Sequence, residues 1–227
     1  MKLYALPFFI LLLSSNSWAI SKLQDIKWKE VSGKDGITVY QPLNYQHDSG
    51  LVPIRFKTVI NHNILRVLSV LSDDSRKQQW LPRLKQTKII QDNSIKDRTV
   101  YYRYESPWPF NDRDFVVHNQ AIFNEKELIV SVAIKSIEHP NISTSNQTVR
   151  GTTYDGYSII KPLGANQTSL EMGFLNSFGG LVPKWIVNIV QKKWPYRFMK
   201  SLKGQLQKND IKINPQFEKY RRFVPKN

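Results

Sequence analysis

Residues Pro107 to Val117 read PWPFNDRDFVV, and this stretch decides how the rest of the chain can be arranged. Two prolines stiffen its first half, and the apolar run after three consecutive charges predicts the start of a buried strand. Successive side chains of a strand point to opposite faces, so Arg113 faces one side and Asp112 and Asp114 the other. These three residues therefore cannot all act on one substrate, which argues against acid–base catalysis here. We expect the loop to lie at the mouth of a ligand cavity.

Strands are expected on both sides of this stretch. Alternating apolar and polar residues, bounded by turn signals, predict two strands near the N-terminus and six more in close succession. The predicted ranges are 37–42, 53–60, 84–91, 98–105, 113–124, 127–137, 148–162 and 168–177. Short connections between consecutive strands favour an antiparallel meander.

Helices are expected at three places. A short helix is predicted within residues 20–30, and an amphipathic helix follows the capping residues 61–63, with further turns over 73–80. A long helix is predicted over 183–207, where Pro195 should kink it or break it in two. Residues 209–227 show no periodicity and are expected to form a loose basic tail. The order of elements predicts an α+β fold, in which a curved antiparallel sheet encloses an apolar cavity against a long C-terminal helix.

The N-terminus predicts export. Lys2 precedes the apolar run 3–13, and Ser17-Trp18-Ala19 has the small-x-small pattern of a signal-peptidase site. We therefore expect a signal peptide over residues 1–19, one folded domain over 20–208 and a soluble periplasmic protein after cleavage. An uncleaved N-terminal anchor is the alternative. The chain has no Cys, so it has neither a disulfide framework nor the lipidation site of a lipoprotein.

Positive charge is concentrated at the end of the chain. The formal net charge is +15, and from Pro183 onward twelve Lys and Arg face only Asp210 and Glu218, a net charge of +10. Such a cluster suits an anionic surface. Since export makes nucleic acid an improbable partner, we expect transient contact with an anionic membrane. A solvated tail that aids solubility is the alternative.

Several motifs occur in the order in which they occur in START domains, the lipid-binding branch of the helix-grip superfamily. They are Trp28 with 34–40, 70–73 with Arg76 and Trp80, Trp108-Pro109 with 112–116, and Gly179-Gly180 with Pro183, Trp185 and Pro195. The chain thus resembles a bacterial exported START domain. The resemblance implies a tunnel for one lipid or sterol-like molecule, gated by the loop 106–112 and the helix 183–207. It implies neither a cofactor nor a metal ion.

One position departs from the family pattern. Sterol-carrying members often place an Arg in the cavity six residues after the Arg of the motif, and this chain has Asn119 there. The departure argues against a sterol ligand while leaving a polar side chain that could meet a head group.

Nine residues are candidates for ligand binding: Arg113, Asn119, Trp108, Phe110, Phe115, Tyr102, Tyr104, Trp185 and Ile189. Each has a structural alternative. Asp112 and Asp114 could instead pair with Arg113 or with loop amides to fix the turn, and Trp108 and Phe110 could pack on the long helix. Trp185 and Ile189 are expected on the inward face of that helix, either in the core or lining a cavity.

The predicted function is lipid binding and transfer without catalysis. The chain lacks a Gly-x-Ser-x-Gly elbow, a phosphate-binding Gly-rich loop and a Cys nucleophile, and its four His are not at metal-ligand spacing. Two alternatives stay open. Related folds host cyclases and hydrolases, which two neighbouring titratable groups in the cavity would favour. The third possibility is an interaction module whose ligand controls docking to a partner.

Overall fold

The computed structural model describes residues 21–143 and 145–226. The predicted signal peptide, residues 1–19, lies outside the described residues. Most of the described chain forms one ten-stranded sheet. Nine strands follow one another in this sheet, and the tenth, the short β8 (Thr148–Arg150), pairs with β6 beside that order. In spatial order, the strands are β1 (Trp28–Lys34), β2 (Ile37–Pro42), β3 (Ile54–Ile60), β10 (Gln167–Ser177), β9 (Thr152–Gly164), β7 (Ile129–Ser136), β6 (Asp112–Asn124), β5 (Asp97–Tyr104) and β4 (Leu84–Ser94). Neighbours in this order are antiparallel, which confirms the predicted sheet.

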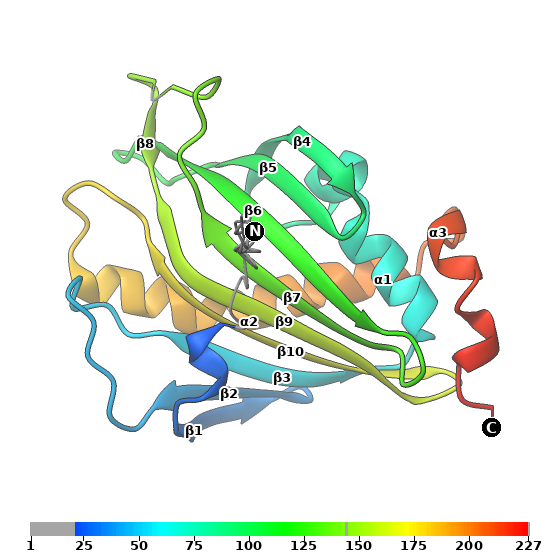
Figure 1. Ribbon diagram of the computed structural model, residues 1–227. Coiled ribbons are helices and arrows are strands. Elements are labelled where there is room, and N and C mark those ends of the chain that lie inside the picture. Colours follow the sequence, from blue (N-terminus) through cyan, green and yellow to red (C-terminus); the bar gives the residue numbers. More distant parts are fainter. Residues whose placement is uncertain (1–20, 144, 227) are drawn as a thin grey trace, which may run out of the picture.

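The long helix α2 (Lys184–Leu206) crosses one face of the curved sheet, as the orange ribbon behind the strands in Figure 1 shows. Helix α1 (Ile64–Ser72) and the short α3 (Pro215–Glu218) lie together at one end of the sheet, opposite the loop that joins β10 to α2. Short 3-10 helices cover Lys22–Gln24, Asp74–Gln79 and Arg221–Phe223. The predicted helix-grip arrangement is therefore confirmed. Within the described residues, none of the helices has the length and apolar character needed to cross a bilayer.

Helix α1 begins where the sequence predicts. The Asn63 side chain accepts a hydrogen bond from the Leu65 N–H at 2.9 Å, which satisfies one of the amides that the first turn leaves free. The apolar face of the helix then packs into the core between the sheet and α2, where Ile64, Leu65 and Val67 are fully buried.

Two predictions about strands were wrong. The segment that was expected to contain only a short helix ends in β1, whose side chains are exposed except for the half-buried Trp28. β1 is an edge strand with one neighbour, so it buries little and shows no alternation of apolar and polar residues. The expected strand 148–162 is divided into β8 (Thr148–Arg150), which runs parallel to β6, and β9. The division falls at Gly151, where a Cβ would lie 2.3 Å from the Phe115 ring.

The expectation for Pro195 was a kink or a break; the break is wrong, because α2 continues through this residue, and the kink stays a prediction. Trp194 and Phe198 flank the proline, stack on each other with centroids 4.7 Å apart, and both contact Phe56 of β3 at 6.1 Å. Packing of these large rings against the sheet holds the helix across a residue that lacks an N–H donor.

Residues after Asn209 are not a loose tail. Phe217 and Tyr220 are buried and stack on Phe123 of β6, with centroid distances of 6.0 and 5.7 Å. The Asn214 N–H donates to the Ser69 hydroxyl at 2.8 Å. Although basic, this segment therefore closes one end of the core, which we call the packed end (α1 with residues 211–223).

Candidate functional site

A cavity of about 660 Å³ lies between the concave face of the sheet and α2, within the usual range for ligand sites. Every second residue of β6 contributes to its wall, as strand geometry requires. This row consists of Arg113, Phe115, Val117, Asn119, Ala121 and Phe123. Apart from Arg113 and Asn119 the row is apolar, so most of it suits a hydrocarbon chain.

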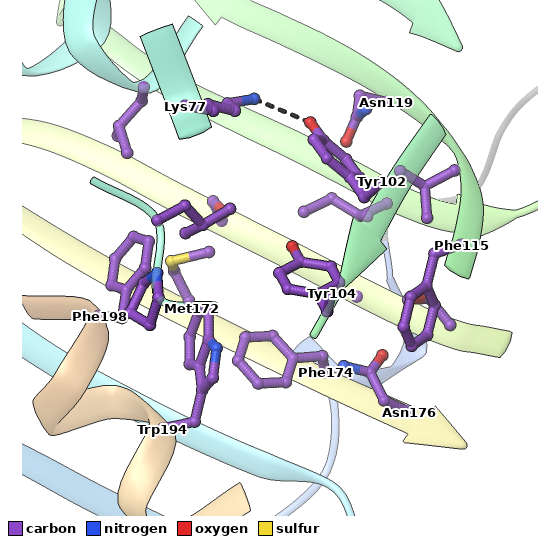
Figure 2. Close-up of a pocket in the computed structure, with 18 of the residues that line it drawn as sticks. Lys77, Tyr102, Tyr104, Phe115, Asn119, Met172, Phe174, Asn176, Trp194 and Phe198 are labelled. Carbon is purple, nitrogen blue, oxygen red and sulfur yellow. Dashed lines mark hydrogen bonds between the residues drawn. The ribbon is translucent and has the colours of Figure 1, made fainter. Parts of the chain in front are cut away.

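Aromatic rings form the opposite wall. Figure 2 shows Phe174 and Met172 of β10 beside Trp194 and Phe198 of α2. The Phe174 and Trp194 rings meet edge to face at 5.0 Å, a favourable arrangement for aromatic pairs. These large side chains give the cavity an apolar surface that excludes water from a bound chain.

One polar cluster lies on the wall formed by the turn 74–79 and β5. Lys77 Nζ is 2.5 Å from Asp74 Oδ1 and donates to the Tyr102 hydroxyl at 2.9 Å, and this hydroxyl donates to Asp74 at 3.1 Å. Arg98 lies 3.5 Å from the other Asp74 oxygen. Figure 2 shows Lys77 and Tyr102 with Asn119 on the same side of the cavity. Both cations of this cluster thus contact the same carboxylate, that of Asp74.

The tyrosines of β5 stay protonated at neutral pH. Burial and then the Asp74 carboxylate raise the pKa of Tyr102 well above its ordinary value. Burial likewise raises the pKa of Tyr104, whose ring meets that of Phe115 edge to face at 6.0 Å. Neither phenol therefore serves as a base, and Tyr104 can donate a hydrogen bond to a ligand, whereas the single proton of the Tyr102 hydroxyl is already donated to Asp74.

Arg113 is the second polar feature of the wall. Its guanidinium donates through Nε to the Phe178 carbonyl at 3.2 Å, and through Nη1 to the Asn111 carbonyl at 2.6 Å and the Ser106 hydroxyl at 3.4 Å. It also lies over the Phe110 ring at 5.5 Å. Burial lowers the pKa of Arg113, yet a guanidinium remains charged in proteins. Arg113 thereby ties together two loops, residues 105–111 and 178–183, which we call the rim loops.

The alternative that Arg113 pairs with its neighbouring carboxylates is wrong. Asp114 accepts two hydrogen bonds from Arg150, at 2.9 and 3.1 Å. Asp112 contacts Arg103 at 2.9 Å and Lys85 at 3.2 Å on the convex side of the sheet. Burial raises the pKa of Asp112, but the Ser106 N–H and these two cations outweigh burial, so that the pKa lies below its ordinary value. The alternation predicted for β6 thus separates the three charges.

The rim loops expose apolar side chains. Trp108 is 92% exposed, so the alternative that it packs on the helix is wrong for this residue. Phe110 lines the cavity while remaining partly exposed. Leu181 is fully exposed in the other loop, and Trp185 is 64% exposed in the first turn of α2. We call this part of the molecule the rim end.

The expected inward face of α2 is confirmed at Phe198 and Met199, which are buried, and is wrong in the first two turns. Trp185 and Ile189 point away from the cavity and are exposed, although both were candidates for ligand binding. The wall is formed instead by Ile186, Val187, Val190, Gln191, Trp194 and Phe198. Five of the eight residues 184–191 are apolar and cover most of the circumference of the first two turns, so their spacing does not single out one face.

Of the nine candidates, six line the cavity: Arg113, Asn119, Phe110, Phe115, Tyr102 and Tyr104. The sequence analysis missed the cluster of Asp74, Lys77 and Arg98. Asp74 and Lys77 are three residues apart and therefore share a face of a helical turn, which was an available signal. Nothing in the sequence places them beside Tyr102. Within the described residues, no group of three potential metal ligands occurs.

Comparisons with known proteins agree with this architecture. A START domain model matches residues 20–211. The chain is 22% identical over 183 residues to the phosphatidylcholine transfer protein of Bos taurus, covering 79% of this chain and 84% of that protein. It is 23% identical over 182 residues to an uncharacterized protein of Pseudomonas aeruginosa, with coverages of 80% and 87%.

Solved structures give the same result. The human StAR-related lipid transfer protein 5 superposes with a TM-score of 0.72 at 19% identity, covering 79% of this chain and 86% of that chain. A STAR-related lipid transfer protein fragment from Xanthomonas axonopodis gives 0.68 at 21% identity, with coverages of 80% and 99%. These structural likenesses confirm the fold, and the match to the START domain model confirms the resemblance stated in the sequence analysis.

Proposed function

Since this chain belongs to the START domain family, we propose that it binds one lipid in the cavity between the sheet and α2 and transfers it between membranes. The observation that carries the proposal is the cavity itself, about 660 Å³ of largely apolar space at the centre of the domain. The names of the matched proteins, a phosphatidylcholine transfer protein and StAR-related lipid transfer proteins, support this function.

Burial of the hydrocarbon supplies the affinity. Each methylene removed from water contributes about 0.8 kcal/mol, and the rings of Phe174, Trp194 and Phe198 provide the surface that replaces water. Release requires the hydrocarbon of the lipid to leave this surface, so transfer must be coupled to an opening of the cavity. The rim end is suited to this step, because its loops lie at the cavity and expose apolar side chains.

The rim end is also suited to a membrane. Aromatic side chains such as the exposed Trp108 and Trp185 are favourable at the lipid–water interface. Exposed basic residues continue from this end along α2, at Lys192, Lys193 and Arg197. Each can contribute about 1 kcal/mol near an anionic surface. Docking by the rim end would bring the mouth of the cavity to the lipids.

Export to the periplasm is part of the proposal. It is supported by the signal-peptide pattern of residues 1–19 and by the absence of Cys throughout the chain. N-terminal sequencing of the protein isolated from the cell envelope should begin at Ile20, and a chain that still begins at Met1 would contradict export by cleavage.

Catalysis has one observation in its favour, because Asp74, Lys77 and Tyr102 are titratable neighbours in the cavity wall. They already satisfy one another, however, and the raised pKa of Tyr102 keeps it from acting as a base. We therefore propose that the cluster supports the cavity wall and that the ligand leaves unchanged. Mass spectrometry of the ligand after incubation tests this, and a product of altered mass would overturn it.

Filling the cavity tests the proposed function. Ala121 lines the cavity in β6, whereas Ala133 of β7 lies between two lining residues and points to the convex face. In an assay of fluorescent phospholipid transfer between vesicles, Ala121→Phe should abolish transfer, and Ala133→Phe should leave it intact. Transfer by Ala121→Phe at the rate of the unaltered protein would contradict the proposal.

Membrane docking has its own test, in which the protein is sedimented with phosphatidylglycerol vesicles. The double substitution Trp108→Ser with Trp185→Ser should weaken binding, and salt should weaken it further. The matched control is Ile122→Ser, which removes an exposed apolar side chain from the convex face of the sheet. Equal losses in both proteins, or binding that ignores anionic lipid and salt, would show that the rim end is not the docking surface.

A further inference from the structure

The two polar features of the cavity wall differ in net charge. In the cluster around Tyr102, Lys77 and Arg98 both contact the Asp74 carboxylate, and Arg98 also contacts Asp92 at 2.8 Å. The cations of this cluster are therefore matched by carboxylates. Arg113 differs, because its recorded partners are two carbonyl oxygens, one hydroxyl and an aromatic ring. In the described part of the chain, no carboxylate lies within ion-pair distance of it.

Burial makes this difference consequential. Arg113 is 7% exposed and lines the cavity, and a buried charge without a counter-charge is unfavourable. Two other lining cations, Lys96 and Arg197, also have no ion pair recorded among the described residues. Lys96 is only half-buried and Arg197 is exposed, so water can solvate them. Arg113 is thus the cavity cation that has most to gain from an anionic ligand.

The guanidinium also has donors to offer. Its Nε and Nη1 are engaged by the two rim loops. No hydrogen bond from Nη2 is recorded within residues 21–143 and 145–226. An arginine carries five N–H donors in a planar fork that matches the oxygens of a phosphate or carboxylate. An oxyanion can therefore bind Nη2 while both rim loops remain attached.

The position of Arg113 gives the ligand an orientation. It stands at one end of the cavity row of β6, and the row then continues through Phe115, Val117, Asn119 and Ala121 to Phe123 at the packed end. An amphiphile with its oxyanion on Arg113 would lay its hydrocarbon along this row. Its far end would reach the rings of Phe123 and Phe217, which both line the cavity.

We propose that Arg113 is the anion-binding residue of the cavity and that the ligand is an amphiphile with a phosphate or carboxylate, held with this group at the rim end. The inference rests on the proposed lipid-binding function and deepens it. Two sources share the chemistry: a glycerophospholipid supplies a phosphate and a fatty acid supplies a carboxylate. The bound oxyanion adds a contact to Arg113, which links both rim loops. The rim loops should therefore be more ordered when the cavity holds a ligand than when it is empty.

Native mass spectrometry of the delipidated full-length mature chain tests the proposal. The protein is offered dioleoyl-phosphatidylglycerol, oleic acid and dioleoylglycerol, a neutral lipid with the same acyl chains as the first. The unaltered protein should prefer one or both anionic probes. Arg113→Gln should bind them about tenfold to a hundredfold more weakly, as expected for the loss of a hydrogen bond to a charged group. Its binding of dioleoylglycerol should be unchanged.

Two substitutions serve as controls. Lys85→Gln removes a cation that contacts Asp112 outside the cavity wall, and it should leave every affinity unchanged. Lys77→Gln removes the cation of the other polar cluster, and it should leave the preference for anionic probes intact. Loss of that preference in Lys77→Gln and not in Arg113→Gln would overturn the orientation and put the oxyanion at the Tyr102 cluster.

The remaining outcomes are also decisive. If all three probes bind with equal affinity to both proteins, the anion site is wrong while lipid binding stands. If no probe binds even the unaltered protein, the proposed function fails first and the inference with it. Should Arg113→Gln not fold, a structure of the unaltered protein loaded with dioleoyl-phosphatidylglycerol decides. The phosphate should lie about 3 Å from Arg113 Nη2, and a phosphate beside Lys77 would refute the proposal.

Discussion

Arg66 and Arg113 hold opposite ends of the same cavity and do so differently. At the packed end, Arg66 of α1 donates to the carbonyls of Leu206, Lys208 and Ile211 at 2.9, 2.7 and 3.2 Å, using all three of its nitrogens. These carbonyls lie at and beyond the C-terminus of α2, where a cation is favourable. At the rim end, Arg113 engages two of its nitrogens, and no hydrogen bond joins the third, Nη2, to the described residues.

The side chains around the two arginines also differ in how far they are exposed to water. Phe217, Tyr220 and Phe123 stack beside the packed end and are largely removed from water. The rim end instead exposes Trp108, Leu181 and Trp185. Figure 1 shows these parts at opposite ends of the sheet, with α1 and α3 at one end and the β10–α2 loop at the other. From this difference we infer that the packed end stabilises the fold and that the proposed ligand exchange takes place at the rim end.

The largest expected effect comes from the packed end. Phe217 is 2% exposed, so Phe217→Ala should lower the free energy of unfolding by about 3–5 kcal/mol, as for other buried phenylalanines. Trp108→Ala at the rim should change it by less than about 0.5 kcal/mol. Urea denaturation followed by tryptophan fluorescence or circular dichroism measures both. Similar losses at the two ends would remove the basis of the comparison.

An intermediate effect is expected in the rim loop before α2. Gly179 has a φ of +64°, and a Cβ there would lie 2.3 Å from the Arg150 carbonyl oxygen. Gly36 has a similar φ of +72° but open space around it. Gly36→Ala should cost about 1–2 kcal/mol for the left-handed backbone alone, and Gly179→Ala should cost more because the loop must also move.

The readout for this pair separates local from global effects. Hydrogen exchange in Gly179→Ala should rise in both rim loops, since Arg113 joins them, and should stay unchanged at the packed end. If Gly36→Ala is as harmful as Gly179→Ala in denaturation, the close approach to Arg150 has no energetic weight.

The smallest expected effect is a dependence of the free energy of unfolding on pH, which arises from Asp112 next to the rim loops. The pKa of Asp112 is lower in the folded protein than its ordinary value, so its contribution to stability is present above the unfolded pKa of about 3.9. That contribution is lost as pH falls through the lower, folded value. At pH 7, Asp112→Asn should cost about 1.5 kcal/mol, as for a hydrogen bond to a charged group.

The two proteins should approach equal stability only as the pH falls through the folded pKa of Asp112, which lies below its ordinary value, because the side chain at position 112 is then neutral in both. Denaturation midpoints at a series of pH values measure the difference. A difference that stays constant down to pH 2 would mean that the charge of Asp112 does not stabilise the fold.

Features that depend on one strand were predictable from the sequence. Alternation along β6 separated Arg113 from its two carboxylates, and the candidates Arg113, Phe115 and Asn119, which share one face of the strand, line the cavity. The two sides of α2 were not predictable, because Trp185 and Ile189 are as apolar as the residues that face inward. Hydrophobic spacing identifies an inward face only when the other face is polar.

Features that depend on contacts between distant segments were not predictable either. The Asp74–Lys77–Tyr102 cluster joins a 3-10 turn to a strand, and only the folded chain brings them together. The packing of Phe217 and Tyr220 was missed for a different reason. Asn214-Pro215 is a helix-start signal, but the helix that follows is a single turn, too short to show periodicity.

Hydrogen exchange of the full-length mature protein, with and without phosphatidylglycerol vesicles, tests the central claim most directly. The claim is that the cavity opens at the rim end and stays closed at the packed end. Vesicles should change exchange in residues 105–111 and 178–190 and leave residues 206–223 as they were. A change confined to 206–223, with the rim loops unaffected, would contradict the account.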